Sequence, residues 1–316
     1  MILLKLIFEE IDMSLIIPDY KELTVTCDKE SATLWVGMNP VGRQCFTLSM
    51  LVELLSLFHR LDEYGSPDPD YPDSIRYVVL QSDHPEIYNL GGDLAYFSEL
   101  VRQNNPEPLR DYGIVCIDLI YWALTGGKRQ ITMIANVAGD TLGGGFEAAL
   151  ACPYIFSEKK SSFSFPESLF GFFPGMGAYD LFKRFAEPLE ADRAFITGKR
   201  YTAQELKLMG GIYSLVESGQ GTQEIKKFIE QRENSLGSHQ ALQKIKQYQQ
   251  GITYESLVFS IDLWVKTAMT LTEKNLRMMA ILTRRQKKKG SVNTLKSKEK
   301  NYNSPASELL KSVASG

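Results

Sequence analysis

The 316-residue sequence is poor in cysteine and histidine and has no long apolar run. Its three histidines lie far apart and none of its four cysteines has CxxC spacing, so the pattern predicts neither a zinc site nor a disulfide framework. No stretch approaches the roughly 18 consecutive apolar residues expected of a membrane span. We therefore expect free thiols in a reducing, cytoplasmic compartment, with no metal and no membrane-spanning segment.

Motifs for nucleotide phosphates and for serine hydrolases are also missing. The chain has no GxxxxGK[ST] motif and no GxSxG elbow, which argues against a P-loop and against a serine triad. The formal net charge of -3 argues against a chain dominated by nucleic-acid binding. The basic run at residues 284–289 is interpreted as the solvated end of a helix, with an anionic surface as the alternative partner.

Alternating strand and helix patterns predict an α/β core. A hairpin is expected at Leu23–Asp28 and Thr33–Met38, and a helix at Leu48–Tyr64, because apolar residues recur there with the periods of a strand and of a helix. Buried strands at residues 75–80 and 131–137 each lead through a glycine turn into a helix. The helices predicted after residue 216 cover residues 223–232, 240–249 and 254–285.

A glycine triplet, Gly143–Gly145, stands between a buried strand and an apolar helix. Glycines at a helix start leave backbone N–H groups uncovered, and the helix dipole favours negative charge there. Such a site could hold a phosphate or an oxyanion. Because the pattern is not GxGxxG, the oxyanion is the preferred interpretation.

Two carboxyl groups have apolar neighbours in the sequence. Glu147 falls in the first turn of the helix after the glycines, and Glu167 follows a strand-like segment. Apolar surroundings raise the pKa of a carboxyl group towards neutrality, as a general acid or base requires. The pattern alone leaves an alternative equally open, in which Glu147 caps its helix and Glu167 pairs with a cation. Asp93 and Asp140 are interpreted as capping residues.

Three segments resemble, in order, the signatures of the crotonase, or enoyl-CoA hydratase/isomerase, superfamily. They are NLGGDL at residues 89–94, AGDTLGGGFEAA at residues 138–149 and FPESLFGFFPGMGA at residues 165–178. The resemblance covers residues 23–216. It implies a spiral of ββα units as the catalytic core, residues 1–216, and a helical region, residues 217–288, that packs trimers or a dimer of trimers. The basic tail, residues 289–316, is expected to be disordered.

The resemblance also assigns roles in catalysis. In that superfamily two backbone amides stabilise the enolate-like oxygen of a thioester, and these correspond to Gly92 and Gly144. The paired glutamates of hydratases correspond to Glu147 and Glu167, which implies addition or removal of water across C2–C3 without a cofactor. By analogy, Glu167 handles the C2 proton and Glu147 handles the hydroxyl group or water.

Departures from typical hydratases shift the expected substrate. Hydratases have a small residue at the position of Leu90, whose backbone cradles the adenine of CoA, and their turn after the second glutamate differs from the one around Met176. Together with LWVKTAM at residues 263–269, these features resemble the bacterial diffusible-signal-factor (DSF) synthases. For Trp264, core packing is the alternative interpretation. The residues assigned to substrate binding are Leu90, Leu142, Gly143, Met176 and Trp264.

The DSF synthases dehydrate a 3-hydroxyacyl carrier-protein thioester to a cis-2-enoyl chain and also cleave the thioester. The resemblance therefore implies a lyase with thioesterase activity that makes a fatty-acid quorum-sensing signal, with acyl carrier protein or CoA as the carrier. The alternative is an enoyl-CoA hydratase or isomerase acting on acyl-CoA. A third hypothesis is a regulatory module that docks a sensor kinase, although the intact pair of glutamates argues against loss of catalysis.

Overall fold

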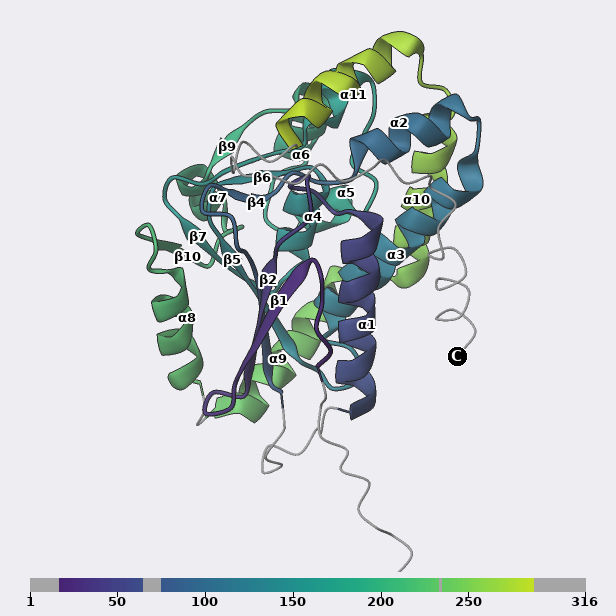
Figure 1. Ribbon diagram of the computed structural model, residues 1–316. Helices are drawn as coiled ribbons and strands as arrows, with labels where there is room; N and C mark the ends of the chain where they lie inside the picture. Colours follow the sequence, from purple (N-terminus) through teal and green to yellow (C-terminus); the bar gives the residue numbers. More distant parts are fainter. Residues whose placement is uncertain (1–16, 65–74, 233–234, 287–316) are drawn as a thin grey trace, which may run out of the picture.

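The computed structural model describes residues 17–64, 75–232 and 235–286, and every element below belongs to these ranges (Figure 1). The tail that the sequence predicts to be disordered, residues 289–316, lies outside the described residues. None of the helices in these ranges combines the length and the hydropathy needed to span a bilayer.

The strands of the described residues form two sheets. The larger sheet has the strand order β1-β2-β3-β5-β7-β10, and the smaller has the order β4-β6-β8-β9. Neighbours are parallel except at β1–β2 and β8–β9, which are antiparallel. The bounds are β1 (Leu23–Asp28), β2 (Thr33–Met38), β3 (Tyr77–Ser82), β4 (Ile87–Asn89), β5 (Thr132–Val137), β6 (Asp140–Leu142), β7 (Tyr154–Glu158), β8 (Ser162–Ser164), β9 (Tyr201–Thr202) and β10 (Ser214–Val216).

Three consecutive ββα units connect the two sheets. In each unit the first strand joins the larger sheet and the second joins the smaller one, giving the pairs β3 and β4, β5 and β6, and β7 and β8. Parallel pairing of the first strands with one another, and of the second strands with one another, stacks the units as successive turns of a spiral. The predicted α/β class and its ββα core are confirmed.

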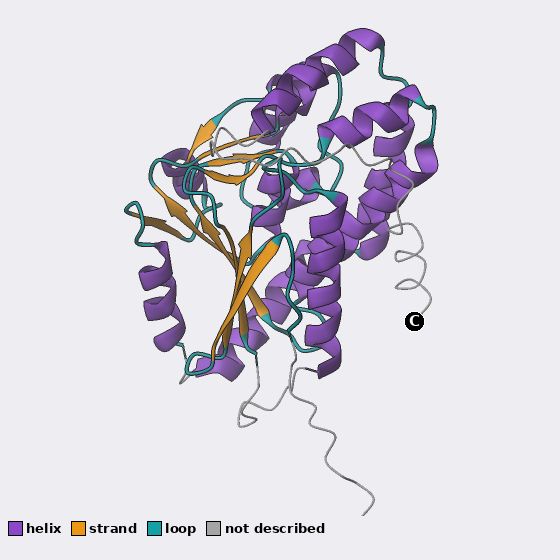
Figure 2. Ribbon diagram, in the orientation of Figure 1, coloured by secondary structure: helices purple, strands orange, loops and turns teal. Residues whose placement is uncertain are grey.

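Helices cover both faces of the larger sheet, as Figure 2 shows in purple against the orange strands. On one face α1 and α3 enclose the main apolar core, and on the other α8 places Ile225 and Phe228 against Ile134 and Phe156. The bounds are α1 (Leu48–Tyr64), α2 (Leu94–Arg102), α3 (Pro106–Thr125), α4 (Gly144–Ala151), the 3-10 helix η1 (Pro166–Phe170), α5 (Ala178–Phe182), α6 (Pro188–Thr197), α7 (Ala203–Met209), α8 (Gly221–Glu230), α9 (Leu236–Gln250), α10 (Tyr254–Ala268) and α11 (Glu273–Gln286).

The hairpin and α1 have the predicted bounds, whereas the predicted single helix over residues 254–285 is wrong. The chain forms two helices there, α10 and α11, separated by a short connection. Asn275 Oδ1 accepts the Thr272 N–H at 2.9 Å, and Thr272 Oγ1 accepts the Asn275 N–H at 3.5 Å. This reciprocal cap starts a new helix, and apolar periodicity that continues across the connection concealed the break.

Candidate active site

Three loops meet at the carboxyl ends of β4, β6 and β8. These strands are parallel neighbours in the smaller sheet, so their carboxyl ends lie at the same edge. β4 leads into residues 90–92, β6 leads into the glycines at the start of α4, and β8 leads into η1, which carries Glu167. All three sequence signatures therefore reach one edge of one sheet.

The loop of residues 90–92 turns one amide towards the glycine triplet. The Gly91 carbonyl accepts the Phe46 N–H at 2.8 Å, and since the C=O and N–H of a trans peptide point in opposite directions, the Gly92 N–H points away from Phe46. Gly91 has a φ of +88°, and a Cβ atom on it would stand 3.0 Å from the Gly144 nitrogen, so glycine is required here. A Cβ atom on Gly144 would in turn stand 3.5 Å from the Gly92 nitrogen, which places the two predicted donors close together.

Glu147 is a buried carboxyl group in the first turn of α4, with 1% of its surface exposed. Its Oε1 atom accepts the N–H of Met176 at 2.7 Å and the N–H of Ala178 at 3.1 Å, so the side chain does not cap its own helix. Burial, followed by the nearby charge of Glu167, raises the pKa of Glu147 to about 8 against the opposing effect of these two hydrogen bonds. Glu147 is therefore largely protonated at neutral pH.

Glu167 approaches the same place from η1. Its Oε1 atom lies against Gly143, the residue that precedes α4, and its Oε2 atom is buried without a hydrogen-bond partner among the described residues. The alternative prediction, in which Glu167 pairs with a cation, finds no partner among the described residues. Burial raises the pKa of Glu167 to about 7, because a carboxylate without a compensating cation is poorly solvated.

Both glutamates line one cavity of about 40 Å³. The predicted residues in its wall are Gly92, Gly144, Glu147, Glu167, Met176 and Trp264. The other three predicted residues, Leu90, Leu142 and Gly143, lie behind the wall. The Leu90 carbonyl accepts a hydrogen bond from Gln286, and the Leu142 carbonyl lies against Gly91. The structure thus brings the predicted catalytic set together and leaves these three as backbone supports.

Most of the apolar lining was not predicted from the sequence. Trp264 both belongs to the core and lines the cavity. Its ring centroid lies 5.1 Å from that of Phe97 and 5.0 Å from that of Phe172. Phe97 and Ile261 have the helical spacing of ordinary core residues, so no sequence signal separates them from the core. The further lining residues are Leu94, Phe97, Tyr112, Gly113, Phe170, Phe172, Pro174, Gly175 and Ile261.

A second cavity of about 40 Å³ adjoins the first one. Gly144 and Met176 line both cavities, so the Met176 side chain stands between them. The walls of the second cavity come from α1, α3 and the larger sheet, including Leu54, Leu119 and Met133, and are almost entirely apolar. The polar centre around the glutamates thus adjoins apolar space suited to hydrocarbon, with Met176 between the two.

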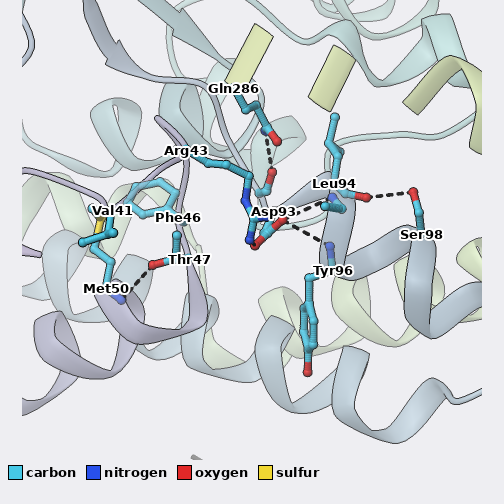
Figure 3. Close-up of polar contacts among 12 residues, drawn as sticks. Val41, Arg43, Phe46, Thr47, Met50, Asp93, Leu94, Tyr96, Ser98 and Gln286 are labelled. Atoms are coloured by element: carbon cyan, nitrogen blue, oxygen red, sulfur yellow. Dashed lines mark hydrogen bonds and ion pairs between the residues drawn. The ribbon is translucent and has the colours of Figure 1, made fainter. Parts of the chain in front are cut away.

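The two aspartates predicted to be caps differ. Asp93 caps α2, since its Oδ1 atom accepts the N–H of Ala95 at 3.2 Å and of Tyr96 at 3.1 Å, and its carboxylate also pairs with Arg43 (Figure 3). The prediction for Asp140 is wrong. It lies in β6, where strand pairing sets it opposite Ser162, and its carboxylate binds that serine and Arg200.

The cysteines contribute to the core rather than to a ligand cluster. Cys45, Cys116 and Cys152 are buried, and Cys27 is exposed. Within the part of the chain that the structure describes, no three His, Cys, Asp or Glu side chains are grouped so that they could hold a metal ion.

The chain is similar to known proteins in sequence and in structure. The sequence model of the family described as enoyl-CoA hydratase/isomerase matches residues 39–290. Among curated proteins, carnitinyl-CoA dehydratase of Salmonella heidelberg is 30% identical over 169 residues, which cover 51% of this chain. The chain spans 59% of the length of that relative.

Solved structures show the same fold at low sequence identity. Enoyl-CoA hydratase from Bacillus halodurans superposes with a TM-score of 0.69 at 18% identity, covering 83% of this chain and all of that one. DspI of Pseudomonas aeruginosa superposes with a TM-score of 0.56 at 21% identity, covering 75% of this chain and 91% of that one.

Replacing Glu147 with glutamine should stabilise the folded chain at alkaline pH. The folded-state pKa of about 8 exceeds the ordinary value of 4.5, so the unfolded chain loses this proton first and folding stability falls as pH rises between those values. Glutamine keeps an oxygen acceptor for Met176 and Ala178 but cannot ionise. We expect Glu147→Gln to melt about 2–5 °C above the wild type at pH 8.5, with a much smaller difference at pH 5, by circular dichroism. A difference that does not grow with pH would contradict the raised pKa.

Proposed function

The chain belongs to the enoyl-CoA hydratase/isomerase, or crotonase, family, as its motifs predict. On that premise we propose that it is a lyase that removes water from a 3-hydroxyacyl thioester across C2–C3. The observation that carries the proposal is the pair of buried carboxyl groups, Glu147 and Glu167, in one cavity with the amides of Gly92 and Gly144. Two carboxyl groups with raised pKa values allow one site to hold a general base and a general acid together.

The two amides serve the thioester carbonyl. Its oxygen accepts hydrogen bonds from the N–H groups of Gly92 and Gly144, and negative charge grows on that oxygen as C2 loses its proton. Donors that are already fixed stabilise this enolate more than the uncharged ground state. Gly144 is also the first residue of α4, whose dipole favours negative charge at that end.

The contacts of the two glutamates divide the proton transfers. Glu167, in its ionised form, takes the C2 proton on its Oε2 atom, which has no hydrogen-bond partner among the described residues. Glu147, whose pKa is raised by burial and by the charge of Glu167, gives its proton to the C3 hydroxyl group. The C3–O bond then breaks, the C2–C3 double bond forms and water leaves. The proton gained by Glu167 returns to Glu147 through solvent, which restores both groups.

The acyl chain runs from this centre into apolar space. Met176 and Trp264 line the cavity beside the glutamates, and Met176 also borders the second, apolar cavity. Methionine is flexible enough to move aside for a hydrocarbon chain. This arrangement supports a fatty acyl substrate over a small polar one.

We also propose acyl carrier protein as the carrier and a free cis-2-enoyl fatty acid, a DSF-type signal, as the product. The support lies at Leu90, whose carbonyl corresponds to the one that typical hydratases turn to the adenine of CoA. Here that carbonyl accepts the Gln286 side-chain amide at 3.2 Å, so one of its two lone pairs is taken and adenine would have to share the acceptor with Gln286. Thioester hydrolysis would use a glutamate-activated water, since the chain has no GxSxG elbow.

The second candidate function is hydration or isomerisation of an acyl-CoA. The name of the Salmonella relative, carnitinyl-CoA dehydratase, favours CoA as the carrier. Both functions use the same amides and glutamates, so only the carrier and the fate of the thioester distinguish them.

We propose further that the chain forms a homotrimer, or a dimer of trimers, through its helical region. On α9 the side chains of Leu242, Ile245 and Tyr248 are exposed by 48%, 54% and 91%. Their spacing of three residues places them on one face of the helix. Apolar side chains gathered on one exposed face are typical of a surface that another subunit covers.

Glu147→Gln and Glu167→Gln should each lower kcat for dehydration by roughly 10²- to 10⁴-fold, because each removes one proton transfer. The wild-type kcat/KM should be bell-shaped, falling below about pH 7 as Glu167 becomes protonated and above about pH 8 as Glu147 ionises. Steady-state assays of enoyl thioester formation over pH 5.5–9.5 measure both. The matched control is Glu230→Gln on the exposed side of α8, and a wild-type rate in either active-site variant removes that glutamate from the mechanism.

One acyl chain offered on both carriers should separate the two candidate functions. We expect kcat/KM at least about tenfold higher for the 3-hydroxyacyl carrier protein than for the CoA thioester, since the Leu90 carbonyl is engaged by Gln286. Mass spectrometry should also detect the free cis-2-enoic acid. Strong preference for CoA, with no free acid released, would favour the hydratase or isomerase instead.

A further inference from the structure

The last residue of α11 reaches the loop that carries the proposed oxyanion donor. The Gln286 side chain is 2% exposed, and its Nε2 atom donates to the Gly92 carbonyl at 2.8 Å and to the Leu90 carbonyl at 3.2 Å. Figure 3 shows this amide directed from α11 at the segment that precedes Asp93. Gln286 is not among the residues that line either cavity, so it contacts the loop without forming part of the cavity wall.

These two bonds complete a set that holds consecutive peptide groups. The Gly91 carbonyl, between the two bound by Gln286, accepts the Phe46 N–H at 2.8 Å. The carbonyls of residues 90, 91 and 92 therefore all accept hydrogen bonds from groups outside the loop. Rotating the Gly91–Gly92 peptide, which carries the Gly92 N–H, would break the Phe46 bond and strain both bonds to Gln286.

We propose that Gln286 is a positioning residue that orients the Gly92 N–H towards the substrate oxygen. The geometry of the oxyanion hole then depends on the position of α11 against the loop of residues 90–92. The inference rests on the proposed function, since it concerns the thioester oxygen. An amide suits the task because its two N–H groups match two carbonyl acceptors. The Gln286 Oε1 atom is buried and accepts no hydrogen bond from the described residues, so only the donor end is used.

Helix α11 also contacts the other half of the site. It packs against α2, which begins after the oxyanion loop, and against η1, which carries Glu167. Asp93 is held separately, by its cap of α2 and its pair with Arg43. Loss of Gln286 should therefore loosen the loop without unfolding α2.

The test uses Gln286→Leu, which removes both donors at similar volume, and Gln223→Leu, an exposed residue of α8, as the matched control. In the full chain with a 3-hydroxyacyl thioester, we expect kcat of Gln286→Leu to fall about 10- to 100-fold with KM within about twofold, because a misaimed donor acts mainly on the transition state. Hydrogen exchange of the free chain should become at least about fivefold faster in a peptide covering residues 86–97. The control should change neither quantity.

Gln286→Glu separates a positioning role from a purely structural one, because only a positioning role predicts that the kcat of the variant relative to the wild type depends on pH. A protonated carboxyl can donate one bond to these carbonyls, whereas a carboxylate repels both. Its kcat relative to the wild type should therefore fall at least about tenfold between pH 5.5 and pH 8.5. A wild-type kcat in Gln286→Leu, unchanged exchange in that peptide, or a pH-independent ratio for Gln286→Glu would each overturn the proposal. If the wild type turned over no thioester, the proposed function would fail and the exchange result alone would decide the role of Gln286.

Discussion

The candidate site depends on the parallel pairing of β4, β6 and β8. Backbone hydrogen bonds set Asn89 beside Thr141 and Leu142 beside Ser164, so the three strands end almost level. Each strand then delivers one part of the site: an amide donor, a second donor with Glu147, or Glu167. A slip of one residue in this register would turn every following side chain to the opposite face. Short strands in a small sheet thus determine chemistry contributed by distant parts of the sequence.

The same edge of the sheet places Glu147 and Glu167 where burial disfavours the ionised form of both carboxyl groups. A pKa of about 8 instead of 4.5 means that burial and the charge of Glu167 together disfavour ionised Glu147 by an amount on the order of 5 kcal/mol. Buried groups without a cation partner are rarely kept for stability alone. In the proposed mechanism this cavity holds an acid and a base together, and the apolar lining that raises their pKa values also suits an acyl chain. Stability and reactivity are therefore set by one property, the low polarity around the glutamates.

Much of the fold and the centre of the site could be predicted from the sequence, because they rest on local patterns. Strand alternation predicted the hairpin and helical periodicity predicted α1. The family resemblance singled out Gly92, Gly144, Glu147 and Glu167, which the structure brings to one cavity. The start of α11 was missed because the apolar periodicity continues across the connection between α10 and α11. The break comes from the cap at Thr272, which this periodicity does not reveal. The role of Gln286 could not be foreseen, since it arises from contact with a loop nearly 200 positions earlier in the chain. Phe97 and Ile261 likewise become cavity residues only through packing.

The central claim is that Glu147 and Glu167, with the amides of Gly92 and Gly144, exchange water across C2–C3 of an acyl thioester. The most direct measurement incubates the chain with a 3-hydroxyacyl thioester in water enriched in both ²H and ¹⁸O, and locates the labels by mass spectrometry. Reversible dehydration should place deuterium at C2 and ¹⁸O on C3 of the recovered hydroxyacyl chain, and Glu167→Gln should abolish both labels. Recovery of an unlabelled chain, or of ¹⁸O only in a released carboxyl group, would contradict the account.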